Sequence, residues 1–386
     1  MLRSDAAAAG RLRALLDDLG YDAGLRGLRG NYAQAPFPTL ETFQPLLARL
    51  PERQRVTYET LLLGQAVERA RLEQAWGAGA VGELLELGLL EAGDDQRLRT
   101  ANWSIVSYFG RYFLVSLNPF YPGARDPDAT VYIGGDSLTL AGYVLSAAGG
   151  GRHFRRGLDL CAGSGIQAIL AASMTDEMAA VELAGLAVEA ARFNVLLNGV
   201  ADRVQVYRGS LYEAAPAGAY DLILSNPPFI PVPAGVPFAL CGAGGEDGLA
   251  VLRPLLEGLP ERLAGDGLAL VYAEGIGDAE GPFVRSLLSE LARRAGLDVQ
   301  LTITSRLSVK SALVLKTVQL QRLKRDVPAE LRQWADLYRR LGASHLYNYV
   351  VRIEHGAGWL SQVMAFDPSR EERGIEVQPG VVVRPA

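Results

Sequence analysis

Apolar and polar positions follow two different patterns along the chain, and the pattern changes near residue 156. From there on, short apolar runs alternate with longer stretches whose apolar residues recur every three to four positions. Short apolar runs are typical of buried strands, and the periodic stretches are typical of helices that cover a sheet. This alternation predicts an α/β fold with a doubly wound, Rossmann-like parallel sheet.

Seven strands and four helices are expected in this region. The predicted strands are Gly157–Cys161, Ala179–Glu182, Val204–Tyr207, Tyr220–Ser225, Leu268–Tyr272, Val299–Thr304 and Ala312–Val318. The predicted helices are Ile166–Ser173, Gly185–Leu197, Leu249–Leu263 and Pro282–Arg294. Only Ser305–Ser311 joins the last two strands, which is too short for a parallel crossover, so we expect them to form an antiparallel hairpin.

The flanking regions have other patterns. Residues 4–20, 57–75 and 84–90 have helical periodicity, and residues 98–117 are rich in the aromatic and β-branched side chains of a hairpin. This order predicts a mostly helical, winged-helix-like substrate-recognition domain over residues 1–125, although a helical cap with no nucleic-acid role fits equally well. Asn118–Gly123 has the composition of a linker. Residues 131–320 are the predicted central domain, and 321–386 a C-terminal extension with a helix at Pro328–Leu341 and a strand at Tyr347–Ile353.

Composition and charge narrow the class of protein. The chain has 386 residues, 49% of them hydrophobic, and a net charge of -5, so no global basic field indicates a nucleic-acid protein. Two cysteines cannot form a disulfide framework, and His153, His345 and His355 are too scattered for a metal site. No apolar run approaches membrane-spanning length, and the N-terminus lacks the apolar core of a signal peptide. We therefore expect a soluble cytoplasmic protein without a bound metal.

A glycine-rich turn follows the first predicted strand. The chain runs through Asp159-Leu-Cys161-Ala-Gly163-Ser-Gly165 into the next helix. Ligands of open parallel sheets bind beyond the carboxyl ends of the strands, where glycines let the backbone approach them closely. Glu182 ends the second strand, and a carboxylate there can accept hydrogen bonds from both hydroxyls of a ribose. We expect all five of these residues to bind a cofactor.

The turn alone leaves two cofactors open, because residues 163–168 also fit the dinucleotide fingerprint G-x-G-x-x-G/A. Two features favour S-adenosylmethionine (SAM). Asp159 lies inside the strand, where its carboxylate can receive an ammonium group or order the turn. In addition, the fourth strand ends in a second motif that dehydrogenases lack.

This second motif is the most specific feature of the chain. The apolar strand Tyr220–Ser225 leads directly into Asn226-Pro227-Pro228-Phe229. An amide or aniline-like nitrogen is a poor nucleophile because its lone pair is delocalised, so an enzyme needs acceptors on both N–H bonds. The Asn226 side chain and the Pro227 backbone carbonyl can be these acceptors, and the prolines fix the backbone. Phe229 offers a face for stacking a planar substrate. We expect these four residues to be catalytic, with Asn226 also beside the cofactor.

Residues 131–320 resemble the "methyltransferase small" superfamily of class I SAM-dependent methyltransferases. Asp159–Gly165 and Ser225–Pro231 carry the resemblance. The superfamily includes HemK-like glutamine methyltransferases of release factors, guanine-N2 methyltransferases of ribosomal RNA and adenine-N6 methyltransferases. Gly244–Leu249 looks HemK-like, whereas Phe229 stands where that branch usually has Tyr. At the end of the third strand, Ser210, followed by Leu211, stands where many methyltransferases carry Asp for the adenine amino group. A hydroxyl accepts that bond more weakly, and we expect both residues to contact the cofactor.

The resemblance implies a SAM-dependent N-methyltransferase and leaves its substrate open. The leading hypothesis is methylation of an exocyclic amino group of a nucleobase in RNA or DNA. Methylation of a protein glutamine is the first alternative. A SAM-binding nucleic-acid-binding or regulatory protein without turnover is another, against which the intact motif at Asn226–Phe229 argues. A small-molecule substrate also remains open, because the fold does not dictate the substrate.

Two basic clusters and one acid near the motifs add further hypotheses. Residues 305–340 hold nine basic residues against three acidic ones, namely Arg306, Lys310, Lys316, Arg322, Lys324, Arg325, Arg332, Arg339 and Arg340. Arg152, Arg155 and Arg156 form the second cluster. Each cluster is either solvated surface charge or a rim that contacts phosphates. Asp136 precedes a predicted helix as an N-cap or nearby turn residue, and its segment can close over the cofactor.

Overall fold

The computed structural model describes residues 2–30, 40–93, 96–117, 131–322, 326–366, 375–378 and 381–383. The chain divides into two compact units. The first combines residues 1–133 with 163–169 and 185–205, and the second combines residues 134–162, 170–184 and 206–386. The predicted linker Asn118–Gly123 lies outside the described residues.

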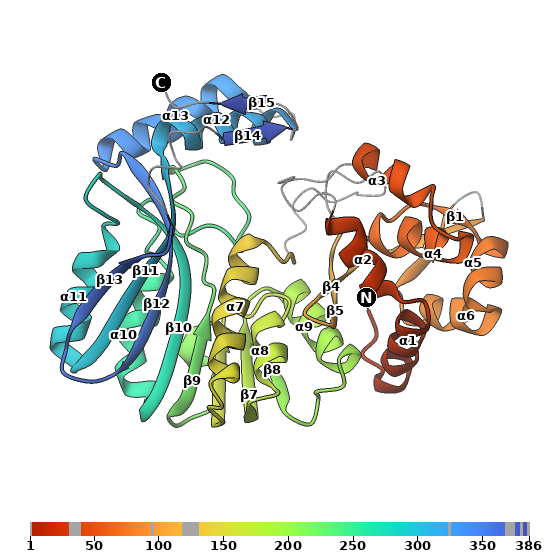
Figure 1. Cartoon of the computed structure of the whole chain (residues 1–386), viewed down its shortest axis with the longest axis horizontal. Helices are drawn as coiled ribbons and strands as arrows, with labels where there is room; N and C mark the ends of the chain where they lie inside the picture. The colour runs from red at the N-terminus through yellow and green to blue at the C-terminus, as the bar shows by residue number, and fades with distance from the viewer. Residues whose placement is uncertain are drawn as a thin grey trace. The chain divides into compact units, whose positions relative to one another are not determined.

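One large sheet organises the part of the chain after residue 150 (Figure 1). Its eight strands lie in the order β13-β11-β12-β10-β9-β6-β7-β8. β6 pairs in parallel with β7 and β9, and β9 pairs in parallel with β10. β12 is antiparallel to both of its neighbours, β10 and β11. The strands are β6 (Phe154–Leu160), β7 (Thr175–Glu182), β8 (Val204–Arg208), β9 (Tyr220–Ser225), β10 (Leu263–Gly277), β11 (Leu297–Ser308), β12 (His345–His355) and β13 (Leu360–Met364). The predicted α/β sheet with one antiparallel strand is confirmed.

The helices described in this region include the four that the sequence predicts between residues 166 and 294. They are α7 (Gly135–Gly149), α8 (Ile166–Ala171), α9 (Gly185–Leu197), α10 (Leu252–Arg262), α11 (Val284–Ala295), α12 (Val309–Arg322) and α13 (Val327–Arg340), with a 3-10 turn, η2, at Leu211–Glu213. The carboxyl-terminal parts of β6 (Gly157–Leu160) and β9 (Leu222–Ser225) are buried at every position, so their residues do not show the alternation of buried and exposed positions that a one-sided strand has.

The predicted hairpin at the end of the sheet is wrong. Ala312–Val318 belongs to helix α12, and the antiparallel strand is β12, from the segment predicted as strand Tyr347–Ile353. A short apolar run such as Ala-Leu-Val-Leu does not by its periodicity distinguish a strand from a packed helix. Because β12 and β13 lie beyond residue 320, the sheet continues through the segment that was predicted as a separate extension. Helix α13 confirms the predicted helix Pro328–Leu341.

The first unit begins with helices and ends with a hairpin. Its helical elements are α1 (Ala6–Asp18), α2 (Tyr21–Gly30), α3 (Leu40–Leu47), α4 (Glu52–Thr57), the π-helix η1 (Tyr58–Leu62), α5 (Arg69–Trp76) and α6 (Ala78–Glu86). The strands β1 (Val67–Glu68), β2 (Leu90–Ala92) and β3 (Arg97–Thr100) form a small antiparallel sheet in the order β1-β3-β2. The expected hairpin is present as β4 (Trp103–Tyr108) and β5 (Arg111–Ser116). Helix α9 of the same unit packs against α1 and β5.

Candidate functional site

The carboxyl ends of β6, β7, β8 and β9 come together at one edge of the sheet. The amide of Gly209, just after β8, donates to the Glu182 carbonyl at the end of β7 over 3.0 Å. The Ser225 hydroxyl at the end of β9 donates to the Leu160 carbonyl at the end of β6 over 2.8 Å. Strand ends joined in this way bring four of the predicted site residues to the same edge: Asp159, Glu182, Ser210 and Asn226.

Two carboxylates and a thiol lie at the ends of β6 and β7. Asp159 is buried on β6, and half-buried Glu182 accepts a hydrogen bond from the Ala184 amide over 2.8 Å. Burial, and then the carboxylates of Glu182 and Asp159, raise the pKa of the Cys161 thiol above its ordinary value. The thiol therefore stays neutral, and the negative charge of this corner comes from the two acids, which suits ligand groups that donate hydrogen bonds or carry positive charge.

The turn after β6 has the conformation that its glycines allow. Gly163 and Gly165 have φ angles of 53° and 78°, in the left-handed region that glycine enters without steric cost. A Cβ atom on Gly165 would lie 3.4 Å from the Cβ of Ala191 on α9, so the turn and this helix are closely packed. Cys161 also has a left-handed φ, of 58°, although it carries a side chain. Helix α8 then begins at Ile166, as predicted.

Ser210 and Leu211 lie at the end of β8. Ser210 is exposed and precedes η2, and its hydroxyl makes no capping hydrogen bond to that turn. Leu211 has a left-handed φ of 41°. The structure therefore places the exposed Ser210 at the site edge, next to the Gly209–Glu182 hydrogen bond.

Asn226 is held by one end of its amide only. Its Nδ2 donates to the Asp136 carboxylate over 2.8 Å and to the Ser137 hydroxyl over 3.3 Å, both in the first turn of α7. An ionised carboxylate can only accept hydrogen bonds, so this contact fixes which end of the amide faces α7. The Asn226 Oδ1 is buried and has no hydrogen-bond partner in the described part of the chain. The motif thus presents an oriented acceptor that no protein group uses.

Asp136 is the residue whose role the sequence did not reveal. It lies in the first turn of α7, as predicted, but Gly134 is the N-cap and the Asp136 carboxylate accepts from Asn226 instead. The two residues are 90 positions apart, and nothing in either local pattern links them. A short polar segment before a helix at the edge of a sheet was the only available signal.

Glycines hold the rest of the motif in place. Phe229 is 8% exposed, and its ring packs against Tyr272 of β10 at a centroid distance of 5.7 Å. A Cβ on Gly244 would lie 2.7 Å from the Phe229 carbonyl carbon, and one on Gly248 2.6 Å from the Phe229 carbonyl oxygen. The HemK-like segment Gly244–Leu249 is therefore a backbone support for the motif, and its glycines allow that close approach.

Strand β10 carries further polar side chains toward the same edge. Val271 is paired with Ser225, so Tyr272 and Glu274 lie along the continuation of β10 past the motif. Burial raises the pKa of Glu274 to about 7, with the Lys316 ammonium opposing the shift and the Asp136 carboxylate adding to it. Neither residue is predicted from the sequence as part of the site. Their only signal was a tyrosine and an acid inside the apolar run of a strand, a pattern that a sheet edge also produces.

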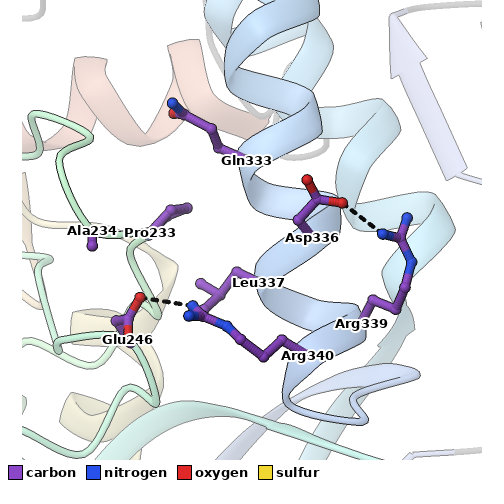
Figure 2. Close-up of a pocket in the computed structure, with 8 residues that line it drawn as sticks. All are labelled: Pro233, Ala234, Glu246, Gln333, Asp336, Leu337, Arg339 and Arg340. Carbon is purple, nitrogen blue, oxygen red and sulfur yellow. Dashed lines mark hydrogen bonds and ion pairs between the residues drawn. The ribbon is translucent and has the colours of Figure 1, made fainter.

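A cavity of about 550 Å³ lies between the segment after the motif and α13 (Figure 2). Arg340 extends from α13 to Glu246 over 2.7 Å, and Arg339 pairs with Asp336 over 2.6 Å. The lining residues are Pro233, Ala234, Glu246, Gln333, Asp336, Leu337, Arg339 and Arg340. None of the predicted cofactor ligands lines this cavity. Both of its arginines are in ion pairs rather than forming a bare positive rim.

The second basic cluster lies at the opposite edge of the sheet. Arg155 and Arg156 are near the start of β6, and Arg152 pairs with Glu354 over 2.7 Å. β6 has seven residues, which at about 3.3 Å per residue separates this cluster from the strand's carboxyl end by roughly 20 Å. Of the first cluster, Lys324 and Arg325 lie outside the described residues.

In the described part of the chain, no group of three or more His, Cys, Asp or Glu side chains is placed to hold a metal ion. No helix among the residues described is long and apolar enough to cross a membrane.

Residues 143–234, which contain the glycine turn and the Asn-Pro-Pro-Phe motif, match the family model of the methyltransferase small domain. The match confirms the predicted resemblance over these residues.

Three curated relatives are similar to part of the chain. A ribosomal protein uL3 glutamine methyltransferase of Bordetella pertussis is 39% identical over 126 residues, 30% of this chain and 42% of that protein. A tRNA1(Val) (adenine(37)-N6)-methyltransferase of Actinobacillus pleuropneumoniae is 40% identical over 91 residues, 23% and 39% of the two chains. A release factor glutamine methyltransferase of Bradyrhizobium diazoefficiens is 37% identical over 144 residues, 34% and 47% of the two chains. The chain thus spans less than half the length of these relatives.

Proposed function

We propose that the protein is a SAM-dependent N-methyltransferase that acts on a planar primary amino or amide group. The observation that carries the proposal is the Asn226 amide, whose nitrogen is fixed by Asp136 and whose buried oxygen has no partner in the described chain. An acceptor of this kind suits a substrate N–H. The hydrogen bond from the substrate N–H to the Asn226 oxygen becomes stronger as the nitrogen loses conjugation and gains positive charge in the transition state.

The residues at the strand ends fit SAM. Asp159 and Glu182 supply carboxylates, for the ammonium group and for the ribose hydroxyls of the cofactor. Gly163 and Gly165 have left-handed backbones with no side chains in the way of a ligand. We propose that Cys161, Ser210 and Leu211 complete the contacts. SAM supplies an already activated methyl group, so the task of the protein is to position the acceptor nitrogen and to draw out its lone pair.

The motif performs that task with groups that do not move. Asn226 Oδ1 accepts one substrate N–H, and the Pro227 carbonyl is proposed to accept the other. Pro228 restricts the backbone, so neither acceptor must reorganise during the reaction. Asp136 contributes by keeping the Asn226 amide from rotating.

A nucleobase amino group in RNA or DNA is the first proposed substrate. A tRNA adenine-N6 methyltransferase among the relatives supports it. The cavity beside the motif presents Arg339 and Arg340 in exposed ion pairs, which contribute little stability and can exchange their partners for phosphates.

A protein glutamine is the second candidate, and two observations favour it. Two of the relatives, 39% and 37% identical over 126 and 144 residues, are glutamine methyltransferases. In addition, Phe229 is only 8% exposed and its ring packs against Tyr272, which leaves little of the ring to stack on a base. An amide side chain needs the two acceptors but no stacking face.

The N-terminal unit is proposed to recognise the substrate. Two helices lie between β1 and β2, and the sheet order β1-β3-β2 supports a winged-helix-like arrangement. Its arginines Arg53, Arg69 and Arg71 lie in ion pairs with Asp18, Glu73 and Glu52. This mixed charge is consistent with a protein surface as well as with a nucleic acid.

We propose the cytoplasm as the location of the protein, since Cys161 and Cys241 are both free thiols.

Calorimetry tests the cofactor. We expect SAM to bind and NADH not to bind. Glu182→Ala should weaken SAM by roughly 1.5–3 kcal/mol, the range for losing charge-assisted hydrogen bonds. Glu177→Ala is the matched control, because Glu177 lies on the same strand but is exposed near its other end. NADH binding without SAM binding would overturn the assignment.

Transfer of a labelled methyl group from SAM tests the substrate. RNA, DNA and ribosomal protein extracts are offered separately, and the modified nucleoside or peptide is identified by mass spectrometry. A nucleic-acid substrate predicts binding that weakens steeply between about 50 and 200 mM salt, because phosphate contacts release counterions. Label in a glutamine, with binding that does not depend on salt, selects the second candidate. No transfer to any planar NH2 group would contradict the proposed function.

A further inference from the structure

Two buried asparagines join α9 to the hairpin β4–β5 within the first unit. Asn194 lies on α9, and Asn198 follows one turn later, just past its end. Neither is exposed by more than 2%. A buried amide group that lacked hydrogen bonds would destabilise the fold. Both side chains have hydrogen-bond partners on β5 for their oxygen and for their nitrogen.

The two amides act as a replacement for a third strand. Asn198 accepts from the Tyr112 amide over 3.1 Å and donates to the Tyr112 carbonyl over 2.7 Å. Asn194 accepts from the Leu114 amide over 2.6 Å and donates to the Leu114 carbonyl over 3.0 Å. Tyr112 and Leu114 are two positions apart on β5, so their peptide groups face the same side, away from β4. The helix thereby satisfies the free edge of the hairpin.

Asn194 makes one contact that Asn198 does not make. Its Nδ2 also donates to the Ser164 carbonyl over 2.9 Å, in the turn between Gly163 and Gly165. The second donor of Asn198 goes instead to the Asn194 carbonyl of the same helix. The two hydrogens and the oxygen of the Asn194 amide are therefore all used, and a single side chain connects β5 with the glycine turn.

We propose that Asn194 is a positioning residue of the cofactor turn, and that through it the β4–β5 hairpin controls the affinity for SAM. The inference rests on the proposed function, in which this turn binds SAM. A glycine turn has few conformational restraints of its own. The hydrogen bond to the Ser164 carbonyl is one restraint on the turn, and the position of β5 decides where Asn194 holds that carbonyl. Substrate bound by the N-terminal unit can then change SAM binding, and SAM can change substrate binding by the same factor.

The test compares Asn194→Leu with Asn198→Leu. Both remove a buried amide that pairs with β5, so both should lower the melting temperature by similar amounts. Only Asn194→Leu removes the hydrogen bond to the Ser164 carbonyl. It should raise the Kd for SAM about tenfold or more, whereas Asn198→Leu should leave the Kd within about twofold. Equal changes in the two variants, or no change in either, would overturn the inference.

A measurement on the wild-type protein covers the case in which the variants do not fold. Hydrogen exchange of the amides of β5 is followed with and without SAM. The amide of Leu114, which donates to Asn194, should exchange more slowly when SAM is bound. Unchanged exchange in β5 while SAM binds would refute the coupling. Absence of SAM binding by the wild-type protein would instead refute the proposed function, and the inference with it.

Discussion

The junction of α9 with the hairpin contains the buried Asn194, and the edge at the end of β9 contains Asn226, whose Oδ1 is buried. The two amides differ in how many of their hydrogen-bonding groups have a protein partner. The Asn194 amide uses its oxygen and both of its N–H groups on backbone partners. The Asn226 amide uses only its nitrogen, on Asp136 and Ser137, and its oxygen has no partner among the described residues. A fully used amide holds structure together, whereas an amide with one committed end and one open end is arranged for a ligand.

Asn226→Ala is expected to have the largest effect, because it removes the amide whose oxygen has no protein partner. If its oxygen acts mainly in the transition state, kcat should fall by about a hundredfold or more, the scale for losing one preorganised acceptor or donor. The Kd for SAM should change little, because this oxygen stabilises no other protein group. The melting temperature should fall by a few degrees, because the variant also loses the Nδ2 hydrogen bonds to Asp136 and Ser137. Asn226→Asp should keep part of the activity, since a carboxylate still accepts. Methyl transfer at the wild-type rate by the alanine variant would make the motif structural, like the Asn194 junction.

A second test asks whether the motif depends on backbone packing as well as on the amide. Gly248→Ala places a methyl group against the Phe229 carbonyl oxygen. We expect kcat to fall by at least about tenfold, in line with the 1–3 kcal/mol typical of overpacking. Gly235→Ala is the control, because its φ of 80° carries the same backbone strain but no atom lies within 4 Å of the added Cβ. Equal losses in steady-state rate for both variants would assign the effect to strain alone.

Asp136→Asn changes the group that holds the nitrogen end of the Asn226 amide. An asparagine at 136 can present either a donor or an acceptor to Asn226, so the Asn226 amide is no longer fixed in one orientation. We expect a three- to tenfold lower kcat, about 1 kcal/mol, with unchanged SAM affinity. Ser146→Ala on an exposed position of the same helix should behave as wild type. A rate unaffected by Asp136→Asn would mean that the neighbours of the motif, not Asp136, orient Asn226.

The smallest expected effect concerns Glu274 and pH. Its pKa is raised to about 7 in the folded protein, mainly by burial, so the folded state holds a proton there that the unfolded chain releases at lower pH. This group therefore favours folding below its ordinary pKa near 4.5, and its contribution is lost as the pH rises through 7. Glu274→Gln should raise the melting temperature by a few degrees at pH 8 and have little effect at pH 5. A difference that does not depend on pH would contradict the assignment of the shift to Glu274.

The sequence predicted those parts of the molecule whose evidence is local. α9 and β9 have the predicted bounds, and the glycine turn and the motif lie where their flanking patterns placed them. The missed features all depend on contacts between distant segments. The pairing of Asp136 with Asn226, the support of Phe229 by Gly248, and the bridge from Asn194 to Ser164 link local patterns that look alike whether or not they touch. The error at Ala312–Val318 has the same cause, since only the partner of a short apolar run decides between strand and helix.

The position of β12 in the sheet has a consequence for synthesis of the protein. β10 and β11 both pair with β12, a strand that is translated after α12 and α13. While the ribosome makes these two helices, the facing edges of β10 and β11 have no partner, and exposed edges of apolar strands invite pairing between chains. The long, mostly apolar β10 is the more vulnerable of the two. A nascent chain stalled before residue 345 should therefore require a chaperone, and release of the next ten or so residues should be the step that makes the sheet resistant to aggregation and to protease.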